Sequence, residues 1–409
     1  MSEQTPDPLF PFDTPPSQET DPVLARLRAE DPVPRVRLAT GRGARLATRY
    51  DDVRQVLSDP RLSRAANDTP RPPVPVPVSM QDTESISNLD APEHTRIRRL
   101  IAKAFPPERT DRLSPRVAAT VDGLLDGMAE QGPPADLVTM LANPLSAAVM
   151  CELFGVPGER REELRTWLDT ATGVTGAPLE EISVAMQHAS DCLVELAEQK
   201  RRHPQDDLLT ALVEAADEDG DRLSPRELIM LVFIMFVGGN HTTSVQLTRS
   251  VLTLFRHPDQ LRVLVDKPEL VPNAVEELMR FTPIGPGAFA RTALEDVELS
   301  GVVVPAGTTV LPVTASANRD PAVFADPDRL DLTRANAKEH MQLGAGPHVC
   351  PGADLARTEL RAALGGLLAR FPTLRPAVPE AELEWEVERQ GEWDLDHIIV
   401  MPRALPVTW

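Results

Sequence analysis

One long apolar helix constrains the fold of this chain more than any other feature of its sequence. Ser224, Pro225 and Glu227 form its start signal: a serine cap, a proline at the first helical position and a glutamate three residues after the cap. Ten apolar residues follow, from Leu228 to Val237, and helical periodicity continues to Phe255. At 1.5 Å per residue such a helix is on the order of 46 Å long. The apolar run is too short to span a membrane, so we expect a helix buried through a large core.

The size and charge of the chain limit its organisation and its partners. Its 409 residues exceed the usual size of one domain, so the choice lies between two domains and one unusually large one. The sequence is mostly helical in period between about Asp111 and Gly220. The formal net charge of −20 argues against a general nucleic-acid binder and against a protein that binds anionic membranes. We therefore expect neither nucleic acid nor a membrane among the partners.

Cysteine usage and the N-terminal segment indicate the compartment. The three cysteines, Cys151, Cys192 and Cys350, are widely spaced, odd in number and without Cys-x-x-Cys spacing. This pattern argues against a disulfide framework or a structural zinc site and favours a reducing cytoplasm. The segment from Met1 to Asp21 is acidic and proline-rich and has no apolar stretch. We therefore expect no signal peptide and no membrane anchor.

The long helix has an unusual interior. Gly238 and Gly239 fall within its pattern without a stop signal, at a cost of roughly 1 kcal/mol each relative to alanine. One interpretation is close packing against a neighbouring element. The other is that a flat or diatomic molecule passes close to the backbone, with Thr242 and Thr243 able to bond back to helix carbonyls. The sequence leaves both interpretations open.

A second unusual stretch surrounds Cys350. The run from Leu343 to Gly352 holds three glycines and two prolines, and a helical pattern follows it at once. The glycines allow another group to approach the backbone closely, and a helix start favours an anion and lowers the pKa of a thiol. Cys350 is then either a buried, inert cysteine or a thiolate that binds a soft or borderline metal.

The loop around Cys350 resembles the haem-binding loop of the cytochrome P-450 family. The family pattern is Phe-x-x-Gly-x-x-x-x-Cys-x-Gly. Leu343 stands in the aromatic position, and Gly344, Cys350 and Gly352 match. The resemblance implies that Cys350 ligates haem iron and that the two glycines shape the cofactor loop.

The interior of the long helix is similar to the oxygen-binding groove of the same family, Ala/Gly-Gly-x-Asp/Glu-Thr. Gly238, Gly239 and Thr242 are in matching places. The resemblance implies a catalytic role for them, with the Thr242 hydroxyl helping to hold and protonate dioxygen. His241 stands where the family usually has an acid. Imidazole can relay a proton, so His241 is either part of the catalytic group, with delivery rerouted through water or substrate, or purely structural.

Cationic side chains come from three regions of the chain. His94 and Arg98 lie four residues apart in a predicted helix that follows Asp90, so they project from one face. Taken alone, this pair is typical of a solvated surface. The resemblance implies that His94 and Arg98, together with Arg291 and His348, bind the haem propionates.

Glu277 and Arg280 form a further motif. They are three residues apart in a predicted helix and therefore meet on one face. In the family, Glu-x-x-Arg lies beneath the haem and forms a structural network with a later arginine. Arg334 is our candidate for that arginine, and Arg329 is the competitor.

The substrate site is implied by the resemblance alone. The segment from Thr282 to Arg291 has too many glycines and prolines for a helix and resembles the strand beside the haem. Two short strands joined by a Pro-Ala-Gly turn are predicted between Gly301 and Val310. The proline run from Pro70 to Pro77 is either a surface loop or a lid. The residues expected to face the substrate are Ile86, Ile234, Val237, Ile284, Gly287, Ala288, Phe289 and Ile398.

The resemblance covers essentially the whole chain. It implies one cytochrome P-450 domain over residues 1–409, mainly α with a small β-rich portion. The expected function is that of a cytoplasmic haem-thiolate monooxygenase with haem b, acting in secondary metabolite biosynthesis. It would hydroxylate or epoxidise a small natural product with O2 and electrons from a ferredoxin or flavodoxin, which would dock near Arg99, Lys103 and Arg357. Two alternatives are oxidative C–C or C–N coupling of aromatic substrates such as cyclic dipeptides, and a non-enzymatic haem-thiolate sensor.

Overall fold

The structure is a computed structural model that describes residues 7–12, 21–38, 41–67, 85–171, 177–217, 223–285, 287, 289–387 and 400–409. The chain divides into two units, each with its own internal packing. Unit 1 contains Met1–Val76, Glu276–Cys350 and Val387–Val400, and unit 2 contains Pro77–Val275, Pro351–Glu386 and Met401–Trp409. The single domain over residues 1–409 stays a prediction.

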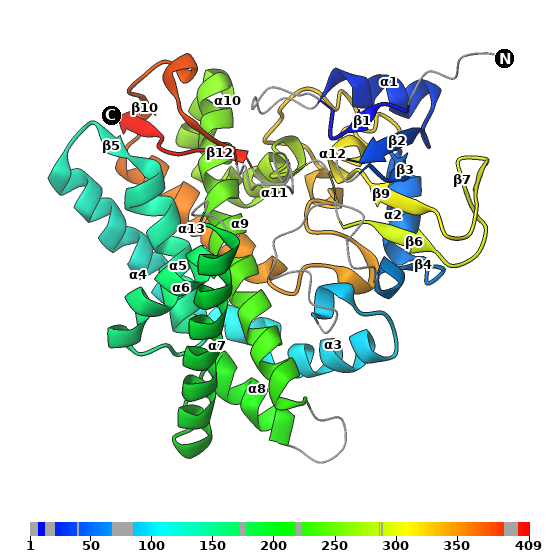
Figure 1. Cartoon of the computed structure of the whole chain (residues 1–409). Helices are drawn as coiled ribbons and strands as arrows, with labels where there is room; N and C mark the ends of the chain where they lie inside the picture. The colour runs from blue at the N-terminus through cyan, green and yellow to red at the C-terminus, as the bar shows by residue number, and fades with distance from the viewer. Residues whose placement is uncertain are drawn as a thin grey trace. The chain divides into compact units, whose positions relative to one another are not determined.

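Unit 2 is built mainly of helices, as the sequence predicts (Figure 1). Its α-helices are α3 (Glu93–Ala104), α4 (Pro107–Gln131), α5 (Asn143–Leu153), α6 (Arg161–Ala171), α7 (Leu179–Arg202), α8 (Leu208–Asp217), α9 (Pro225–Arg256), α10 (Pro258–Asp266) and α13 (Ala353–Arg370). Shorter turns of helix are η3 (Ile86–Asn88), η4 (Val138–Ala142), η5 (Gly158–Arg160), η6 (Pro268–Leu270) and η9 (Glu380–Glu382). Helix α11 (Val271–Phe281) begins in unit 2 and ends in unit 1.

Helix α9 begins with the predicted capping box. Ser224 Oγ accepts the N–H of Glu227 at 3.1 Å, and the Glu227 carboxylate accepts the N–H of Ser224 at 2.7 Å. The helix continues for 32 residues, one residue past the predicted end, and packs against α5, α7, α8, α10 and α13. The prediction of a long core helix is therefore confirmed.

The same helix is long and apolar enough to cross a membrane. It is the one such helix among the residues described here, and 56% of its most apolar window is buried inside the protein. A core helix meets the same criteria of length and composition, because burial in protein and burial in lipid both select apolar side chains.

Unit 2 also contains a small antiparallel sheet. Its central strand β13 (Pro406–Thr408) pairs with β10 (Arg375–Pro376) on one side and with β5 (Ala135–Asp136) on the other. Two further strands, β11 (Trp385–Val387) and β12 (Val400–Pro402), pair with each other.

Unit 1 contains a six-stranded mixed sheet in the order β1-β2-β3-β9-β6-β4. The strands are β1 (Leu9–Phe10), β2 (Arg35–Leu38), β3 (Gly43–Ala47), β9 (Thr309–Pro312), β6 (Arg291–Ala293) and β4 (Leu62–Ser63). Successive residues of a strand point to opposite faces. Leu46 accordingly packs in one core cluster with Leu24 of α1 (Pro22–Glu30), whereas Ala47 packs in the other with Val53 of α2 (Tyr50–Ser58).

The predicted strands of unit 1 are only partly confirmed. The two short strands expected between Gly301 and Val310 are present as β8 (Val302–Val304) and β9, and β8 pairs with β7 (Val297–Leu299). In the segment from Thr282 to Arg291, the described residues before Arg291 are not in a strand, and the ladder with β9 begins at Arg291. The remaining helical elements of unit 1 are η1 (Ala65–Asn67), α12 (Thr314–Ala317), η7 (Ala337–Glu339) and η8 (Gly346–His348). The fold class, mainly α with a small β-rich portion, is confirmed.

Candidate active site

The loop that carries Cys350 lies in unit 1 and is held by its own backbone and by α2. The Cys350 N–H donates to the Leu343 carbonyl at 2.9 Å. Gly344 has φ +78°, in the left-handed region that favours glycine. Gly346 lies so close to α2 that an added Cβ would come within 2.5 Å of the Leu57 carbonyl oxygen. The loop is therefore tight, and the Cys350 side chain at its end is partly exposed.

The other two cysteines differ from Cys350. Cys151 and Cys192 are buried. Burial raises the pKa of the Cys151 thiol to about 11 and also raises the pKa of Cys192, so both are protonated near neutral pH and inert. Among the described residues there is no group of three His, Cys, Asp or Glu side chains that could hold a metal ion. Cys350 is thus the one cysteine of the chain with access to a ligand.

Two of the predicted propionate partners lie in unit 1. Arg291 opens strand β6 and is 3% exposed, and its Nη1 donates to the carbonyl oxygens of Phe289 at 2.8 Å and Ala290 at 3.3 Å. His348 ends the η8 turn, two residues before Cys350, and is partly exposed.

The Glu-x-x-Arg motif forms a fully buried ion-pair network in unit 1. The Glu277 carboxylate accepts from Arg280 Nε at 2.7 Å and Nη2 at 2.8 Å, and from Arg334 Nε at 3.1 Å. Arg280 and Glu277 are both 0% exposed. The Arg329 side chain instead pairs with Asp331 at 2.8 Å on the surface. Of the two arginines that the sequence left open, the structure places Arg334 against Glu277.

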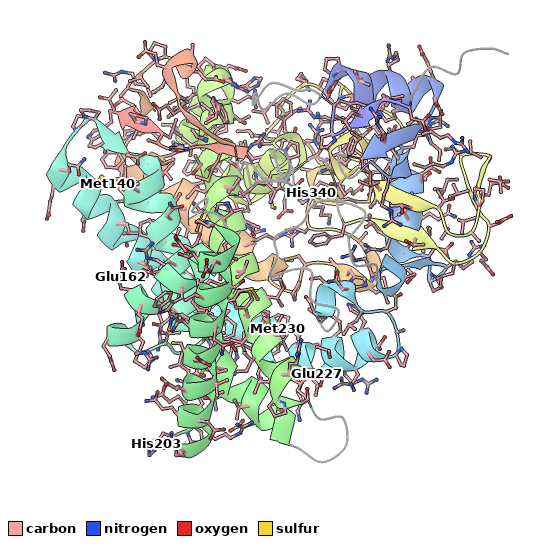
Figure 2. All side chains as sticks on the ribbon, viewed as in Figure 1. Met140, Glu162, His203, Glu227, Met230 and His340 are labelled. Atoms are coloured by element: carbon pink, nitrogen blue, oxygen red, sulfur yellow. The ribbon has the colours of Figure 1, made fainter. Side chains whose placement is uncertain are left out.

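His340, labelled in Figure 2, supports the chain just before the Cys350 loop. Its Nδ1 accepts the N–H of Gln342 at 3.1 Å, and its Nε2 lies 3.3 Å from the Glu276 carboxylate. An accepting Nδ1 requires the proton on Nε2, which then donates to Glu276. The residue therefore ties the chain just before Leu343 to the middle of α11.

Helix α9 of unit 2 is buried on both sides of a partly exposed window. The five residues from Gly238 to Thr242 have intermediate exposure, whereas Phe236, Val237 and the run Thr243–Leu254 are buried. No described atom lies within 4 Å of a Cβ built on Gly238, so this glycine faces open space. An added Cβ on Gly239 would meet the Met150 sulfur of α5 at 2.3 Å. The packing interpretation therefore holds at Gly239, whereas Gly238 has the open space that the other interpretation requires.

Thr242 bonds back within α9, as the sequence suggested. Its Oγ1 donates to the carbonyl of Gly238 one turn earlier. The neighbouring His241 keeps some exposure to solvent, but protein atoms surround most of its ring, and this desolvation lowers the pKa of the imidazole to about 4. His241 is consequently neutral near pH 7, whereas a carboxylate at the same position would be charged.

The predicted pair on α3 also lies in unit 2. His94 is buried and Arg98, one turn later, is partly exposed. Between them, Arg96 forms an ion pair with Glu227, the capping residue of α9 that is labelled in Figure 2. The sequence analysis did not identify Arg96, because its partner lies 131 residues away along the chain. This ion pair fixes α3 against the start of α9.

The residues predicted to face the substrate are found in both units. Ile234 and Val237 are buried in α9, and Ile86 in η3 is partly exposed. In unit 1, Ile284 is partly exposed and Phe289 is 36% exposed. Gly287 lies against β9, where an added Cβ would come within 2.5 Å of the Pro312 carbonyl oxygen. The positions outside the described residues are Ala288, Ile398 and the proline run from Pro70 to Pro77.

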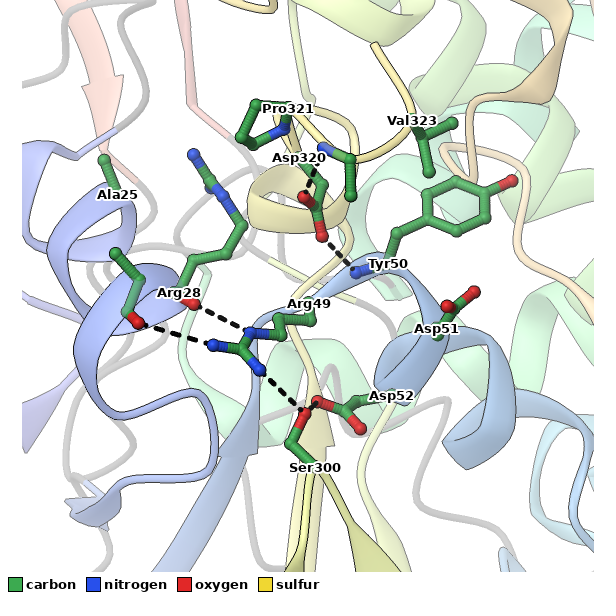
Figure 3. A pocket seen from close by; sticks show the side chains of 12 residues that line it. Ala25, Arg28, Arg49, Tyr50, Asp51, Asp52, Ser300, Asp320, Pro321 and Val323 are labelled. Atoms are coloured by element: carbon green, nitrogen blue, oxygen red, sulfur yellow. Dashed lines mark hydrogen bonds between the residues drawn. The ribbon is translucent and has the colours of Figure 1, made fainter.

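A separate pocket of about 490 Å³ lies in unit 1 between α1, α2 and the turn after α12 (Figure 3). None of the predicted active-site residues lines it. Its polar groups bond to one another: Arg49 Nε donates to the Arg28 carbonyl at 3.0 Å, the Tyr50 N–H donates to Asp320 at 2.9 Å, and Ser300 donates to Asp52. These contacts connect structural elements of unit 1.

Comparison with known proteins assigns the family. The cytochrome P450 family model matches residues 167–266 and 264–381. Nocardicin C N-oxygenase from Nocardia uniformis subsp. tsuyamanensis is 46% identical over 405 residues, covering 98% of each chain. The chain belongs to the cytochrome P450 family.

Two further P450s give the same result. Mycinamicin IV hydroxylase/epoxidase from Micromonospora griseorubida is 41% identical over 384 residues, covering 94% of each chain. The crystal structure of the LnmA cytochrome P450 hydroxylase from the leinamycin biosynthetic pathway of Streptomyces atroolivaceus has a TM-score of 0.89 and 44% identity, and the match covers 98% of this chain and all of that one. This P450 is therefore an oxidoreductase, a monooxygenase with a small-molecule substrate and a redox partner.

The residues of this P450 fit the haem-thiolate cofactor that the family implies. In unit 1, Cys350 is the partly exposed cysteine and can supply a thiolate. In unit 2, the open space at Gly238 leaves the backbone of α9 uncovered where the family binds dioxygen. A chain in which Cys350 was buried, or in which a side chain filled the space at Gly238, would not meet these requirements.

Proposed function

We propose that this P450 hydroxylates or epoxidises a small natural product, with haem b as its cofactor and electrons delivered singly by a ferredoxin or flavodoxin. The observation that carries the proposal is the partly exposed window from Gly238 to Thr242 in an otherwise buried helix. Burying this helix along its whole length would remove more apolar surface from water. A window with a glycine facing open space is the arrangement expected where a substrate and dioxygen must reach the backbone.

Cys350 is proposed to bind the haem iron, with Gly344 and Gly352 shaping the loop around it. Bound haem with a thiolate ligand supplies the activation of dioxygen, because the thiolate pushes electron density onto iron and favours O–O cleavage. His94, Arg98, Arg291 and His348 are proposed to bind the two propionates, since carboxylates form their strongest hydrogen bonds with cationic donors. Glu277, Arg280 and Arg334 hold the fold of unit 1 and take no part in the chemistry.

Thr242 and His241 are proposed to control proton transfer at the partly exposed window of α9. The Thr242 hydroxyl donates to Gly238 in the structure and can also accept, so rotation of Oγ1 into the window can pass on one proton. A neutral His241 with a pKa of about 4 is a weak base and carries no acidic imidazolium proton near pH 7, although its ring keeps one N–H. The proton at Thr242 Oγ1 then comes from water that enters the window.

The substrate class follows from the relatives. Nocardicin C and mycinamicin IV are the substrates named for two P450s that match nearly the whole chain. We propose a substrate of the same kind, a product of secondary metabolism, bound by Ile86, Ile234, Val237 and the segment from Ile284 to Phe289, with Ala288 and Ile398 as further candidates.

The redox partner is proposed to dock on a basic surface of unit 2. Arg99 and Lys103 are exposed on α3, and Arg357 on α13 is partly exposed. On a chain with a net charge of −20, a local group of cations directs an acidic partner to one place. Ferredoxins and flavodoxins are acidic electron carriers of suitable size, and we propose that the encounter takes place in the cytoplasm.

Spectroscopy of the purified protein tests the cofactor assignment. Reduction under carbon monoxide is expected to give the absorbance band typical of thiolate-ligated haem. Cys350→Ser should lose that band, whereas Cys192→Ser should keep it, because the serine hydroxyl can still accept from Arg160. A protein that stays colourless after haemin is supplied, or a band that survives in Cys350→Ser, would refute the assignment.

Product analysis tests the reaction. With a surrogate ferredoxin system and a candidate substrate, the proposal expects a product heavier by one oxygen atom that incorporates label from ¹⁸O2. The neutral His241 favours oxidative C–C or C–N coupling of an aromatic substrate, such as a cyclic dipeptide, as the second candidate. Coupling yields a product lighter by two hydrogen atoms with no label. A sensor would consume no reductant when substrate is added.

A further inference from the structure

Arg64 is a buried cation that the proposed chemistry does not use. It follows strand β4 directly and is 7% exposed. Removing a guanidinium from water is costly unless polar groups replace the lost hydration. The contacts of Arg64 therefore show which groups replace the lost hydration of its guanidinium.

Two contacts of Arg64 lie on the segment just before β6. Its Nη1 donates to the Ala290 carbonyl at 2.6 Å, and its guanidinium carbon lies 4.8 Å from the centre of the Phe289 ring. The first distance is that of a strong hydrogen bond to a cation. The second is within the range of a cation–π contact, which is strongest where water is excluded.

The register of the sheet explains why Arg64 reaches this place. Strand β4 is antiparallel to β6, with Leu62 opposite Ala293 and Ser63 opposite Thr292. Continued by one residue, this register places Arg64 opposite Arg291. Two cations at facing positions repel each other. Both are directed at carbonyl oxygens, Arg64 at Ala290 and Arg291 at Phe289 and Ala290.

Among the described residues, ladder pairing of β6 starts at Arg291. The two guanidinium groups donate to the carbonyl oxygens of residues 289 and 290 and so help to hold the backbone there. Ala290 is fully buried, so the Phe289 side chain projects the other way and is 36% exposed. An exposed aromatic ring would normally move between rotamers. Here the Arg64 guanidinium covers one of its faces.

We propose that Arg64 is a positioning residue that fixes the Phe289 ring as a wall of the substrate pocket and so determines which ligands and which substrate atoms fit. The proposal rests on the pocket role proposed above for Phe289. The proposed effect concerns bulky ligands, because a small ligand does not reach the Phe289 ring.

The test uses the purified ferric haem protein and two azole probes of different size, imidazole and 4-phenylimidazole, each titrated by its spectral shift. The ratio of their dissociation constants reports the shape of the pocket and needs no turnover. Arg64→Met should weaken or strengthen 4-phenylimidazole binding by about fivefold, the factor that corresponds to the loss of one cation–π contact. Imidazole binding should stay within about twofold. Arg64→Lys should fall between Arg64→Met and the wild type, because the cation is kept and the planar fork is lost.

A matched control variant and a double-mutant cycle distinguish a positioning role of Arg64 from a role in stability. Arg61, three residues earlier, has a side chain that is 44% exposed and pairs with Asp59 at 2.6 Å. Arg61→Met should leave both constants unchanged. Phe289→Leu should shift the ratio by a similar factor, and adding Arg64→Met to it should produce little further change, because the two residues act through one contact.

The outcomes distinguish this inference from the proposed function. A ratio that moves in Phe289→Leu but not in Arg64→Met overturns the role of Arg64 alone. A ratio unchanged in Phe289→Leu overturns the pocket assignment as well. Equal changes for both probes, or loss of haem from Arg64→Met, would show that Arg64 supports the cofactor site or the fold and would also overturn the inference.

Discussion

Replacing Glu277 by glutamine is expected to destabilise this P450 severely. The Glu277 carboxylate is fully buried and pairs with two guanidinium groups, those of Arg280 and Arg334, besides accepting the N–H of Asp331 at 3.0 Å. Glutamine has nearly the same shape, so packing is preserved while the negative charge is lost. Two buried cations then remain without a counter-ion. Removing one partner from a buried ion pair typically costs about 3–5 kcal/mol.

The size of this loss can be measured by thermal unfolding. A cost of about 4 kcal/mol is a large part of the 5–15 kcal/mol that usually stabilises a folded protein. With an unfolding entropy of about 2 cal/mol/K per residue, it lowers the melting temperature of a chain this long by about 5 °C. Circular dichroism of haem-bound wild type and Glu277→Gln at one scan rate checks this value.

Arg329→Gln is the matched control for this experiment. The Arg329 side chain makes an exposed ion pair with Asp331, which is worth less than about 1 kcal/mol. Its backbone carbonyl, which accepts from both buried arginines, is unchanged by the substitution. A Glu277→Gln protein that melts within about 1 °C of wild type, or an equal loss in Arg329→Gln, would refute the reasoning.

Three further predictions concern α9 and α13. Thr242→Ala should release a larger share of the electrons as peroxide while Thr242→Ser stays close to wild type, and unchanged coupling to product in Thr242→Ala would contradict the proton role. The pKa of His241 is lower in the folded than in the unfolded state, so the unfolded state gains a proton first as pH falls. The free energy of unfolding should therefore drop by up to about 3 kcal/mol between about pH 6.5 and pH 4. In urea titrations, His241→Gln should abolish this drop. Glu359 in α13 makes stability depend on pH in the opposite direction, because complete burial raises its pKa well above the ordinary value. The stability that comes from its neutral form is present below the unfolded pKa and is lost as pH rises through the folded pKa. Glu359→Gln should therefore stabilise the protein at alkaline pH and flatten its pH dependence, and an unchanged pH profile would show that the carboxyl is not neutral.

Two elements show how far sequence reasoning reached. The start of α9 and its length were predicted to within one residue, because the capping box and the apolar periodicity act over a few neighbouring residues. The different roles of Gly238 and Gly239 could not be predicted. They depend on the Met150 side chain, which α5 brings against one glycine and not the other.

The segment before β6, in contrast to the start of α9, could not be predicted from local sequence. The resemblance suggested a strand from Thr282 onward, yet the described ladder of β6 begins at Arg291, and Arg64 and Arg291 donate to the carbonyl oxygens just before it. No periodicity in the sequence marks such side-chain contacts. Arg64 lies 226 residues from Ala290 along the chain, so its contact could not be read from either segment alone.

The sequence by itself determined the family, the fold class and the ends of the long helix, since these follow from short motifs and local patterns. Tertiary structure alone decided which arginine completes the Glu277 network, which glycine faces open space, that His241 is neutral and that Arg64 reaches the Phe289 ring. The physical reason is burial. A hydrogen-bond partner, a dielectric environment or a filled space belongs to residues that meet only when distant parts of the chain pack together.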